Sequence, residues 1–544
     1  MQKFEHCIAH FIVRFRWILV LLLPIIAIAL GSGGKNLKFS TDYRVFFSED
    51  NPELLAFEKL EKTYTKNDNV MFILTPKDGT VFTPRTLHAI EQITEEAWQI
   101  PHSLRVDSLS NFQNTESEED DLYVHDLIEN ADQYSSEDIE KIRNIALHEP
   151  LLVNNLINPD GSVTGVNVTI QLPGIDATKE TPETVAYARK MADKIRQTYP
   201  WLEVRLSGMT FMNNAFAENS KHDMGTLVIF SFVLMILTLM FLTRSIVGVL
   251  GVLGIIAFSI ISAMGIMGRI GYPLTPPSSS APTIILTIAI ASSVHVLVSI
   301  LYNLRSGMDK HEAIRESIRI NLQPVFIASI TTVIGFMSMN FSEVPPFHHL
   351  GNVTAFGVIA AFFMTIFFLP AFMAVMPLRV RPFKDGHAHW TERIAEFNIR
   401  HWKKLLVSLG LVIAILFACI PRNQLNDVFV HYFDETIDFR VSSDYMVEHL
   451  TGLYRIDYSL ESGERGGISQ PEFLKEVKAF ADWYRSQPET IHVNTISDTF
   501  QRLNKNMHGD DPAFYRIPEK RDLAAQYLLL YEMSLPYGLD LNNQ

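Results

Sequence analysis

The sequence predicts an α-helical membrane bundle with seven spans, together with extracytoplasmic α+β domains built of βαβ units. Three observations predict this class. Seven apolar stretches are long enough to cross a bilayer, two long polar blocks show alternating strand and helix patterns, and basic residues gather in one set of loops. Only 19% of the 544 residues are charged. That fraction is low for a soluble protein.

The first apolar stretch covers residues 17–30 and extends back along the apolar face of Phe4, Ile8 and Phe11. A helix needs about 20 apolar residues to cross about 30 Å of hydrocarbon. A cleaved signal peptide is the alternative for this stretch, because residues 27–29 resemble a cleavage site. A matching segment recurs later in the chain, which favours a span. The other spans are expected at about 224–243, 247–270, 281–302, 322–341, 349–376 and 404–420.

Basic residues of the short loops predict the orientation. One set of loops holds Lys3, Arg14, Arg16, Arg244, Arg305, Lys310, Arg315, Arg319, Arg379, Arg381, Lys384, Arg393, Arg400, Lys403 and Lys404. The opposite set holds only Arg269. The positive-inside rule therefore predicts a cytoplasmic N-terminus and two extracytoplasmic polar blocks. Residues 304–321 have an amphipathic pattern, and we interpret them as a connecting helix that lies on the cytoplasmic headgroups.

Composition and motifs exclude several classes of protein. A net charge of −14 gives no support for nucleic-acid binding. The absence of a phosphate-binding Gly-x-x-x-x-Gly-Lys-Ser/Thr loop argues against ATP as the direct energy source, and no other cofactor is indicated. Neither a nucleophile elbow nor a zinc-protease motif is present, so an enzyme is not expected. The two cysteines, Cys7 and Cys419, predict neither a disulfide framework nor a metal site. The acidic run at residues 116–121 is interpreted as a solvated loop.

An internal repeat links the two halves of the chain at an offset of 385 residues. Trp17 matches Trp402, and Asp42 matches Asp427. Strand patterns at 69–74 and 454–459 are each followed by an amphipathic helix, at 85–98 and 471–484, and by a second strand pattern, at 105–112 and 492–500. The order strand, helix, strand predicts a βαβ unit in each copy.

The first copy continues further than the second. A helix (135–147), a strand (163–172), a helix (182–199) and a strand (203–207) complete two βαβ-like halves. The second copy is expected to be an incomplete domain, and a complete two-repeat protein would have about 770 residues and about twelve spans. The predicted divisions are 1–34 (N-terminus and first span), 35–222 (α+β domain), 223–376 (five spans), 377–403 (cytoplasmic linker), 404–420 (seventh span) and 421–544 (second α+β domain).

Local motifs in three spans point to a family. They are Ile290-Ala291-Ser292-Ser293-Val294-His295 in the fourth span, Thr331-Thr332-x-x-Gly335-Phe336 in the fifth, and Val344-Pro345-Pro346-Phe347 with Gly351, Gly357 and Leu369-Pro370 in the sixth. Together with the order of domains, they resemble the MmpL-type and hopanoid-exporter-like branch of the resistance-nodulation-division superfamily. The resemblance implies a proton-driven exporter of hydrophobic or lipid-like molecules in a bacterial inner membrane, often trimeric.

The fourth span departs from that family's pattern. Ser292 stands where the resemblance leads us to expect an aspartate, and His295 is the only titratable residue at mid-depth in the spans. We interpret His295 as a proton-relay residue, with Ser292 and Ser293 as hydrogen-bonding neighbours. The alternatives are a neutral structural histidine, or a relay that has been lost from this half. In the fifth span, Thr331, Thr332 and Gly335 are candidates for helix packing or for relay neighbours.

Three functions remain open. The first is a transporter for hydrophobic or lipid cargo, acting as a homo-oligomer or with a periplasmic partner. The second is a lipid receptor, because the five-span bundle resembles sterol-sensing modules, and the missing carboxylate favours this alternative. The third is an accessory subunit of a larger export complex. The glycines of the third span (Gly248, Gly251, Gly254, Gly265 and Gly268) are expected to allow close helix packing.

Overall fold

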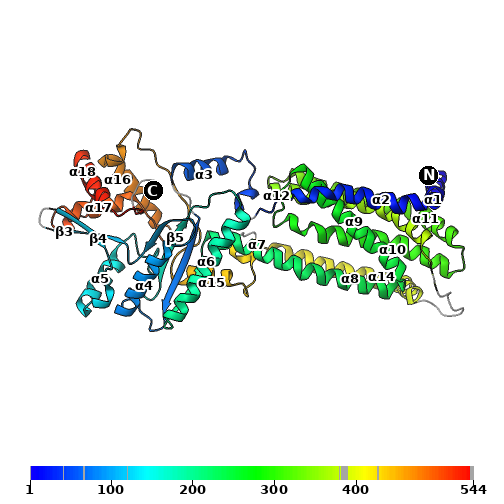
Figure 1. Ribbon diagram of the computed structural model, residues 1–544, viewed down its shortest axis with the longest axis horizontal. Helices are drawn as coiled ribbons and strands as arrows, with labels where there is room; N and C mark the ends of the chain where they lie inside the picture. Colours follow the sequence, from blue (N-terminus) through cyan, green and yellow to red (C-terminus); the bar gives the residue numbers. More distant parts are fainter. Residues whose placement is uncertain are drawn as a thin grey trace. The chain divides into compact units, whose positions relative to one another are not determined.

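The structure, a computed structural model, divides into two compact units. It describes residues 2–40, 42–64, 68–118, 121–378, 380, 390–424 and 428–539. One unit, here the span unit, combines Met1–Phe39 with Ser220–Phe429. The other, here the polar unit, combines Ser40–Asn219 with Val430–Gln544 and holds the six strands of the described residues (Figure 1).

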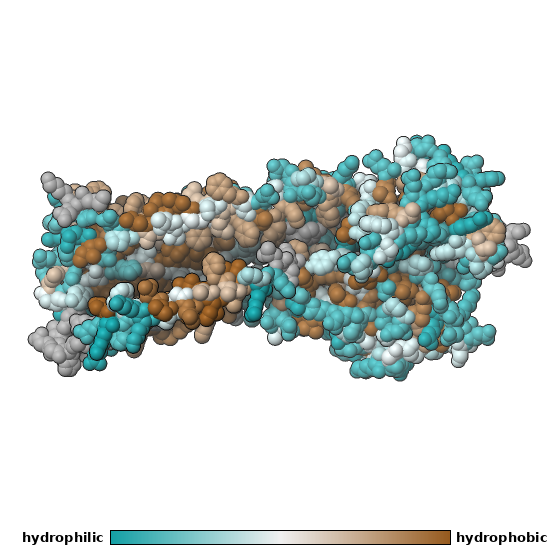
Figure 2. Space-filling model, turned by 180° about the vertical axis from the view of Figure 1, so that it is seen from behind, coloured by the Kyte–Doolittle hydropathy of each residue, from teal (hydrophilic) through white to brown (hydrophobic). Residues whose placement is uncertain are grey.

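Seven helical segments of the described residues are long and apolar enough to cross a membrane. They are Arg16–Asn36, Met209–Thr243, Ile246–Ile270, Ser278–Arg305, Lys310–Phe341, Pro345–Val375 and Arg393–Arg422. The predicted number and order of spans are thus confirmed. Apolar side chains cover much of the visible surface of these helices, whereas the polar unit exposes mainly hydrophilic residues (Figure 2). An exposed apolar surface of this extent is what a lipid environment requires.

The span unit consists of α1 (Gln2–Arg14), α2 (Arg16–Gly31), α8 (Leu227–Thr243), α9 (Ile246–Ile270), α10 (Ala281–Arg305), α11 (Lys310–Met337), α12 (Pro345–Phe363), α13 (Leu369–Val375) and α14 (Trp390–Cys419). Helix α7 (Met209–Gly225) leads into α8. A π-helical turn, Met364–Phe368, separates α12 from α13. Pro370 explains this turn, because a proline has no N–H for the carbonyl four residues earlier and its ring crowds that carbonyl.

Helix α9 approaches its neighbours most closely at glycines. A Cβ on Gly265 would lie 2.2 Å from the carbonyl oxygen of Leu30, and one on Gly268 would lie 2.2 Å from that of Gly33. Helices α2 and α9 therefore meet backbone to backbone, which only small residues permit. At Gly248, a Cβ would lie 2.7 Å from Leu297 of α10. The predicted packing role of these glycines is confirmed.

The segment 304–321 differs from our expectation. Helix α10 runs on to Arg305 and α11 begins at Lys310, so most of the segment is the first part of the fifth span rather than a separate connector. Ile314 and Ile318 are fully buried in the same apolar core as Ile12 of α1. The amphipathic pattern was correct, but its apolar face packs on protein instead of lipid headgroups.

Helix α1 is also distinct from the predicted extension of the first span. It ends before Phe15, whose backbone interrupts the helix. Its buried face carries Ala9, Ile12 and Val13, whereas Phe4 and Phe11 are exposed. A separate amphipathic helix therefore precedes the first span.

Three basic residues near helix ends bond the last carbonyls of neighbouring helices. The guanidinium of Arg305 donates to the Thr243 carbonyl over 2.7 Å, and the Lys310 ammonium donates to the Met376 carbonyl over 2.7 Å. At the other end of the bundle, Arg269 donates to the Ala29 carbonyl. Cations are favourable there, because the last carbonyls of a helix have no partner within it.

The polar unit contains a four-stranded sheet formed by β1 (Asn69–Pro76), β2 (Ser103–Ser108), β5 (Thr164–Ile170) and β6 (Leu202–Ser207). Its order is β2-β5-β1-β6, and every neighbouring pair is antiparallel. β1 and β2 each pair with β5 and not with one another. With α4 (Pro84–Ala97) and α6 (Ala177–Thr198), the strands form two interleaved split βαβ units, as in ferredoxin-like folds. The two predicted βαβ halves are confirmed.

Both faces of this sheet are covered. Met71 and Ile73 pack with Met446 and Leu450, at the end of α15 (Asp438–His449), a helix of the second copy. Phe72 points to the opposite face and is also fully buried. Helices α4 and α6 pack on the strands as well. The first segment of the second copy therefore completes the fold of the first copy.

The acidic run at 116–121 is partly a hairpin, not a solvated loop. Strand β3 (Gln113–Glu118) pairs with β4 (Asp121–Asp126), and residues 119–120 between them lie outside the described part. Glu116 forms an ion pair with Lys141 of α5 (Ser136–His148) at 3.0 Å. Charged residues are rare in strands, so the β-propensity of this sequence gave no indication of the hairpin.

The described residues of the second copy repeat the first helices of the first copy but form no strand. The short helix at 429–432 and α15 repeat the short helix at 43–46 and α3 (Pro52–Thr63) at an offset of 386 residues, one more than the sequence suggested. Helix α16 (Pro471–Arg485) corresponds to α4. Residues 454–459 form no strand, and 492–500 lead into α17 (Ile496–Asn506), followed by α18 (Arg521–Ser534). Both strand predictions for this copy were therefore wrong. Asp427 lies outside the described residues.

Candidate functional site in the fourth span

Helix α10 turns Ser293 away from the other two predicted relay residues, Ser292 and His295. Ser293 is fully buried, and its hydroxyl donates to the Ile290 carbonyl of its own helix over 3.1 Å. Ser292 is half-buried, and His295 is exposed. Successive residues turn by about 100° around a helix, so residues two apart point in nearly opposite directions. His295 and Ser293 therefore do not form one cluster.

His295 lines a shallow hollow of about 330 Å³ on the surface of the span unit. Helix α10 supplies Val294, Val298, Ser299 and Tyr302 to this hollow. These residues share a side of the helix because positions three, four and seven apart lie above one another. A titratable imidazole, a hydroxyl and a phenol thus face the same space, which otherwise has valine walls.

Asn321 of α11 forms the opposite wall of the hollow. Its amide Nδ2 donates to the Ser317 carbonyl over 2.9 Å, and the Ser317 hydroxyl donates across to the Val296 carbonyl of α10 over 2.9 Å. The Ser317 bond fixes α11 against α10 at this depth, and the Asn321 bond holds that amide to its own helix. Tyr302 and Asn321 were missed in the sequence. Tyr302 could have been found, because it lies seven residues after His295.

The fifth-span candidates do not reach α10. The Thr331 hydroxyl donates to the Ile327 carbonyl over 2.8 Å, and the Thr332 hydroxyl donates to the Ala328 carbonyl over 2.7 Å. Both bonds lie within α11. A Cβ on Gly335 would meet no atom within 4 Å. Bonding to the backbone of their own helix accounts for the threonines, and Gly335 makes no close contact.

Other polar groups lie inside the bundle. Among the described residues, the hydroxyls of Ser259, Thr354 and Thr365 are buried without a hydrogen-bond partner. Buried hydroxyls are normally paired. Helices α9 and α12 and the π-helical turn each contribute one of them. The bundle interior thus keeps unused hydrogen-bonding capacity, although the central portions of its spans contain no carboxylate.

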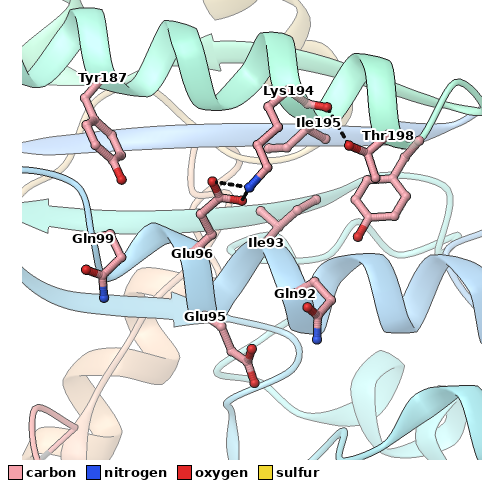
Figure 3. Close-up of a pocket in the computed structure, with 10 residues that line it drawn as sticks. Gln92, Ile93, Glu95, Glu96, Gln99, Tyr187, Lys194, Ile195 and Thr198 are labelled. Atoms are coloured by element: carbon pink, nitrogen blue, oxygen red, sulfur yellow. Dashed lines mark hydrogen bonds and ion pairs between the residues drawn. The ribbon is translucent and has the colours of Figure 1, made fainter.

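A second hollow, of about 410 Å³, lies between α4 and α6 in the polar unit (Figure 3). The Lys194 ammonium bonds both carboxylate oxygens of Glu96, at 2.8 and 2.9 Å, across this hollow. Tyr187 and Gln99 line the same space. This ion pair raises the pKa of Lys194 above its usual value. A charged, solvent-exposed notch is unsuited to an apolar ligand.

A buried charged cluster joins the C-terminal helices to the first copy. Arg502 of α17 contacts Glu149 at 3.4 Å and is almost fully buried. Asp498, one turn earlier, pairs with Arg485, yet burial raises its pKa above the usual value. Burial, with the nearby charges of Glu149 and Asp498, raises the pKa of Tyr515 to about 12. These groups hold the two copies together, because a buried charge requires a partner.

The described part of the chain contains no group of three or more His, Cys, Asp or Glu residues that could hold a metal. Cys7 and Cys419 are exposed and unpaired with each other.

Comparison with known proteins identifies relatives. The family profile described as "MMPL family" matches residues 58–408, well over half of the chain. MJ1562 of Methanocaldococcus jannaschii, named as a membrane protein, is 21% identical over 386 residues, which cover 69% of this chain and 94% of MJ1562. YdgH of Bacillus subtilis, also named as a membrane protein, is 24% identical over 269 residues, which cover 47% of this chain and 29% of YdgH. The match thus spans less than a third of YdgH.

Proposed function

Since the chain belongs to the MMPL family, we propose that it is a transporter of the resistance-nodulation-division type that exports hydrophobic or lipid-like molecules. The family match carries this proposal, because it covers both the split βαβ domain and the bundle from α8 to α13. The exposed apolar surface of the span unit and the lack of a nucleotide-binding motif are consistent with a proton-driven membrane carrier.

The energy source is proton movement, and His295 is the residue that takes up and releases the proton. An imidazole titrates near neutral pH. An ionisable residue within a span is energetically costly, so one that is present usually serves a function. The hollow beside His295 gives the imidazole access to the Tyr302 phenol and the Asn321 amide. Ser292 is half-buried on the same helix and supplies a neighbouring hydroxyl to His295. The Ser293 hydroxyl instead bonds the backbone of its own helix.

The protein resides in a bacterial plasma membrane with its N-terminus in the cytoplasm and its polar unit outside. Arg305 and Lys310 at one end of the bundle, against Arg269 as the one basic residue counted for the short loops at the other, support this orientation. The lipid bilayer and its apolar solutes are the immediate partners. A homo-oligomer or a periplasmic protein completes the export route.

A lipid receptor of the sterol-sensing type is the second candidate. One observation favours it: Ser292 replaces the carboxylate expected in the fourth span, so coupling would depend on His295 alone. A receptor would bind the same apolar ligands but would not move them against a gradient.

A transport assay distinguishes the two candidates. The chain is reconstituted into vesicles with a fluorescent phospholipid as probe, and a pH gradient is imposed. The transporter proposal predicts probe movement that requires the gradient, stops with a protonophore and is indifferent to ATP. Saturable binding of the probe, without gradient-dependent movement, would contradict transport and support the receptor.

A further inference from the structure

The hollow between α4 and α6 is lined by polar groups that the fold does not use. Its volume is about 410 Å³, and the buried Ile93 and Ile195 are its apolar lining residues. Five lining side chains have no hydrogen-bond partner in the described part of the chain, namely Gln92, Glu95, Gln99, Tyr187 and Tyr199. Groups that serve only to hold two helices together would be paired with one another.

Both helices turn one side toward this hollow. Glu95 and Glu96 lie three and four positions after Gln92 on α4, so the three side chains share a side of that helix. Tyr187 and Lys194 of α6 are seven positions apart and share a side in the same way. Figure 3 shows the Tyr187 side chain directed from α6 toward α4. The lining groups therefore converge on one space.

The C-terminal ends of both helices lie at the hollow. Helix α4 ends at Ala97 and α6 ends at Thr198, and the lining residues Gln99 and Tyr199 follow these ends within two positions. The last carbonyls of a helix have no partner within it and carry partial negative charge. Two helix ends of this polarity favour a cation between them.

The charged side chains of the hollow add to this preference. Glu96 is neutralised by Lys194 at 2.8 Å. Glu95 has no ion-pair partner among the residues that the structure describes, so the charged lining residues sum to one negative charge. The hollow thus lacks one positive charge for neutrality.

The ammonium of Lys194 shows which cation chemistry suits the hollow. Both carboxylate oxygens of Glu96 bond it, at 2.8 and 2.9 Å. These bonds and the Glu96 charge raise the pKa of Lys194, and Tyr187 and Tyr199 act in the same direction. A tyrosine ring attracts an ammonium group within about 6 Å of its centre. Carboxylates and tyrosines are therefore placed together around a nitrogen cation.

We propose that this hollow binds an organic ammonium ion of the size of ethanolamine or choline, with Glu95 as its counter-ion and Tyr187 and Tyr199 as aromatic contacts. The site lies in the polar unit and is independent of proton movement at His295. Alkyl groups on the nitrogen weaken its hydration and gain from the aromatic rings, whereas Na⁺ keeps its water and lacks a full set of oxygen ligands.

Isothermal titration of the whole reconstituted chain with tetramethylammonium chloride tests this proposal, with NaCl as the control salt. The wild type should show saturable binding of tetramethylammonium and no binding of Na⁺. Glu95→Gln should weaken that binding by about fivefold. Glu183→Gln, which changes an exposed glutamate of α6 outside the hollow, should leave it unchanged.

Tyr187 provides a second variant pair. Tyr187→Leu should weaken binding by about threefold, because it removes the aromatic ring. Tyr187→Phe should keep the wild-type affinity, because the ring and not the hydroxyl attracts the cation. Equal losses in the two variants would contradict an aromatic contact with the ligand.

Lys194→Met gives the result that a purely structural ion pair would not. It frees Glu96, so that an added ammonium can replace the Lys194 ammonium, and binding should strengthen by about fivefold or more. Weaker binding in Lys194→Met would overturn the proposal. Equal heats for tetramethylammonium and NaCl, or unchanged binding in Glu95→Gln, would also overturn it.

The lipid used for reconstitution distinguishes two sources of the ammonium group. Phosphatidylglycerol vesicles are diluted either with phosphatidylethanolamine or with an uncharged glycolipid. If the headgroup of a phospholipid is the ligand, phosphatidylethanolamine should compete and lower the apparent affinity for tetramethylammonium. Equal affinity in the two kinds of vesicle would assign the site to a free amine.

Discussion

The two copies of the extracytoplasmic repeat share their first helices, but among the described residues only the first copy has a sheet. Helices α3 and α15 have equal lengths at an offset of 386 residues, and α4 has a counterpart in α16. β1 pairs with β5 and β6, whereas the equivalent residues 454–460 form no strand. A helix satisfies its backbone groups within one segment, whereas a strand depends on a neighbour from elsewhere. The comparison shows that helices of a sequence repeat can form in both copies, whereas a strand forms only where a partner strand is present.

The largest expected effect comes from placing a charge at equivalent positions of the two copies. Phe72→Asp introduces an unpaired carboxylate into a fully buried site and should destabilise the polar unit by about 4 kcal/mol or more. Tyr458→Asp changes a residue that is 53% exposed and should cost about 1 kcal/mol or less. Urea-dependent proteolysis of the polar unit measures both. Equal losses would mean that the second copy contains a formed sheet.

An intermediate effect is expected for glycines of the first and seventh spans, which head the two repeats. A Cβ on Gly33 would lie 2.1 Å from the Gly265 carbonyl oxygen. Gly33→Ala must therefore push the first span away from α9, which should lower the free energy of unfolding by about 2–3 kcal/mol. A Cβ on Gly410 of α14 meets nothing within 4 Å, and Gly410→Ala should be neutral or slightly stabilising, because alanine favours helices. Thermal unfolding in detergent compares the two. A Gly410→Ala loss as large as that of Gly33→Ala would place a tight helix contact on α14.

The smallest effect concerns pH and a residue of the second copy. His492 occupies the position equivalent to the buried Val106 of β2. Burial, followed by the charges of Arg485 and Arg455, lowers the pKa of His492, although its Nδ1 bonds the Val153 carbonyl. As the pH falls, His492 is protonated at a higher pH in the unfolded chain than in the folded chain. The free energy of unfolding should therefore decrease as the pH drops below about 6.5.

His492→Gln removes that titration. Between pH 7.5 and 5.5 the wild type should lose about 1 kcal/mol more than the variant. Thermal unfolding at the two pH values provides the comparison, with His148→Gln as an exposed-histidine control. If the variant keeps the full pH dependence of the wild type, the depressed pKa of His492 is not its source.

Sequence patterns predicted the spans and the first sheet because both follow from local composition. Twenty apolar residues suffice for a span, and the run 69–74 is strand-like by itself. The pattern 492–500 failed because α17 is buried although it is polar. Its Asn506 bonds Thr115, and its Arg502 bonds Glu149, both in the first copy. Partners 353 and 391 residues away determine that helix, and no local window of the sequence contains them.

The candidate site was predicted only in part for a similar reason. Excluding other titratable residues in the spans identified His295, and helical periodicity could have added Tyr302. The exposure of His295 and the place of Asn321 depend on how α10 and α11 pack, which involves bonds such as that between Ser317 and Val296. Thr331 and Thr332 were assigned by resemblance to a family pattern, and their hydroxyls bond their own helix.

Cargo-dependent proton movement across reconstituted vesicles, followed with an internal pH-sensitive dye, tests the central claim that His295 couples protons to transport. Three proteins are compared: the wild type, His295→Gln, which keeps hydrogen-bonding groups but does not titrate, and His401→Gln, which alters an exposed histidine of α14. The account predicts proton movement in the wild type and in His401→Gln, and none above protein-free vesicles in His295→Gln. Wild-type proton movement in His295→Gln would contradict it.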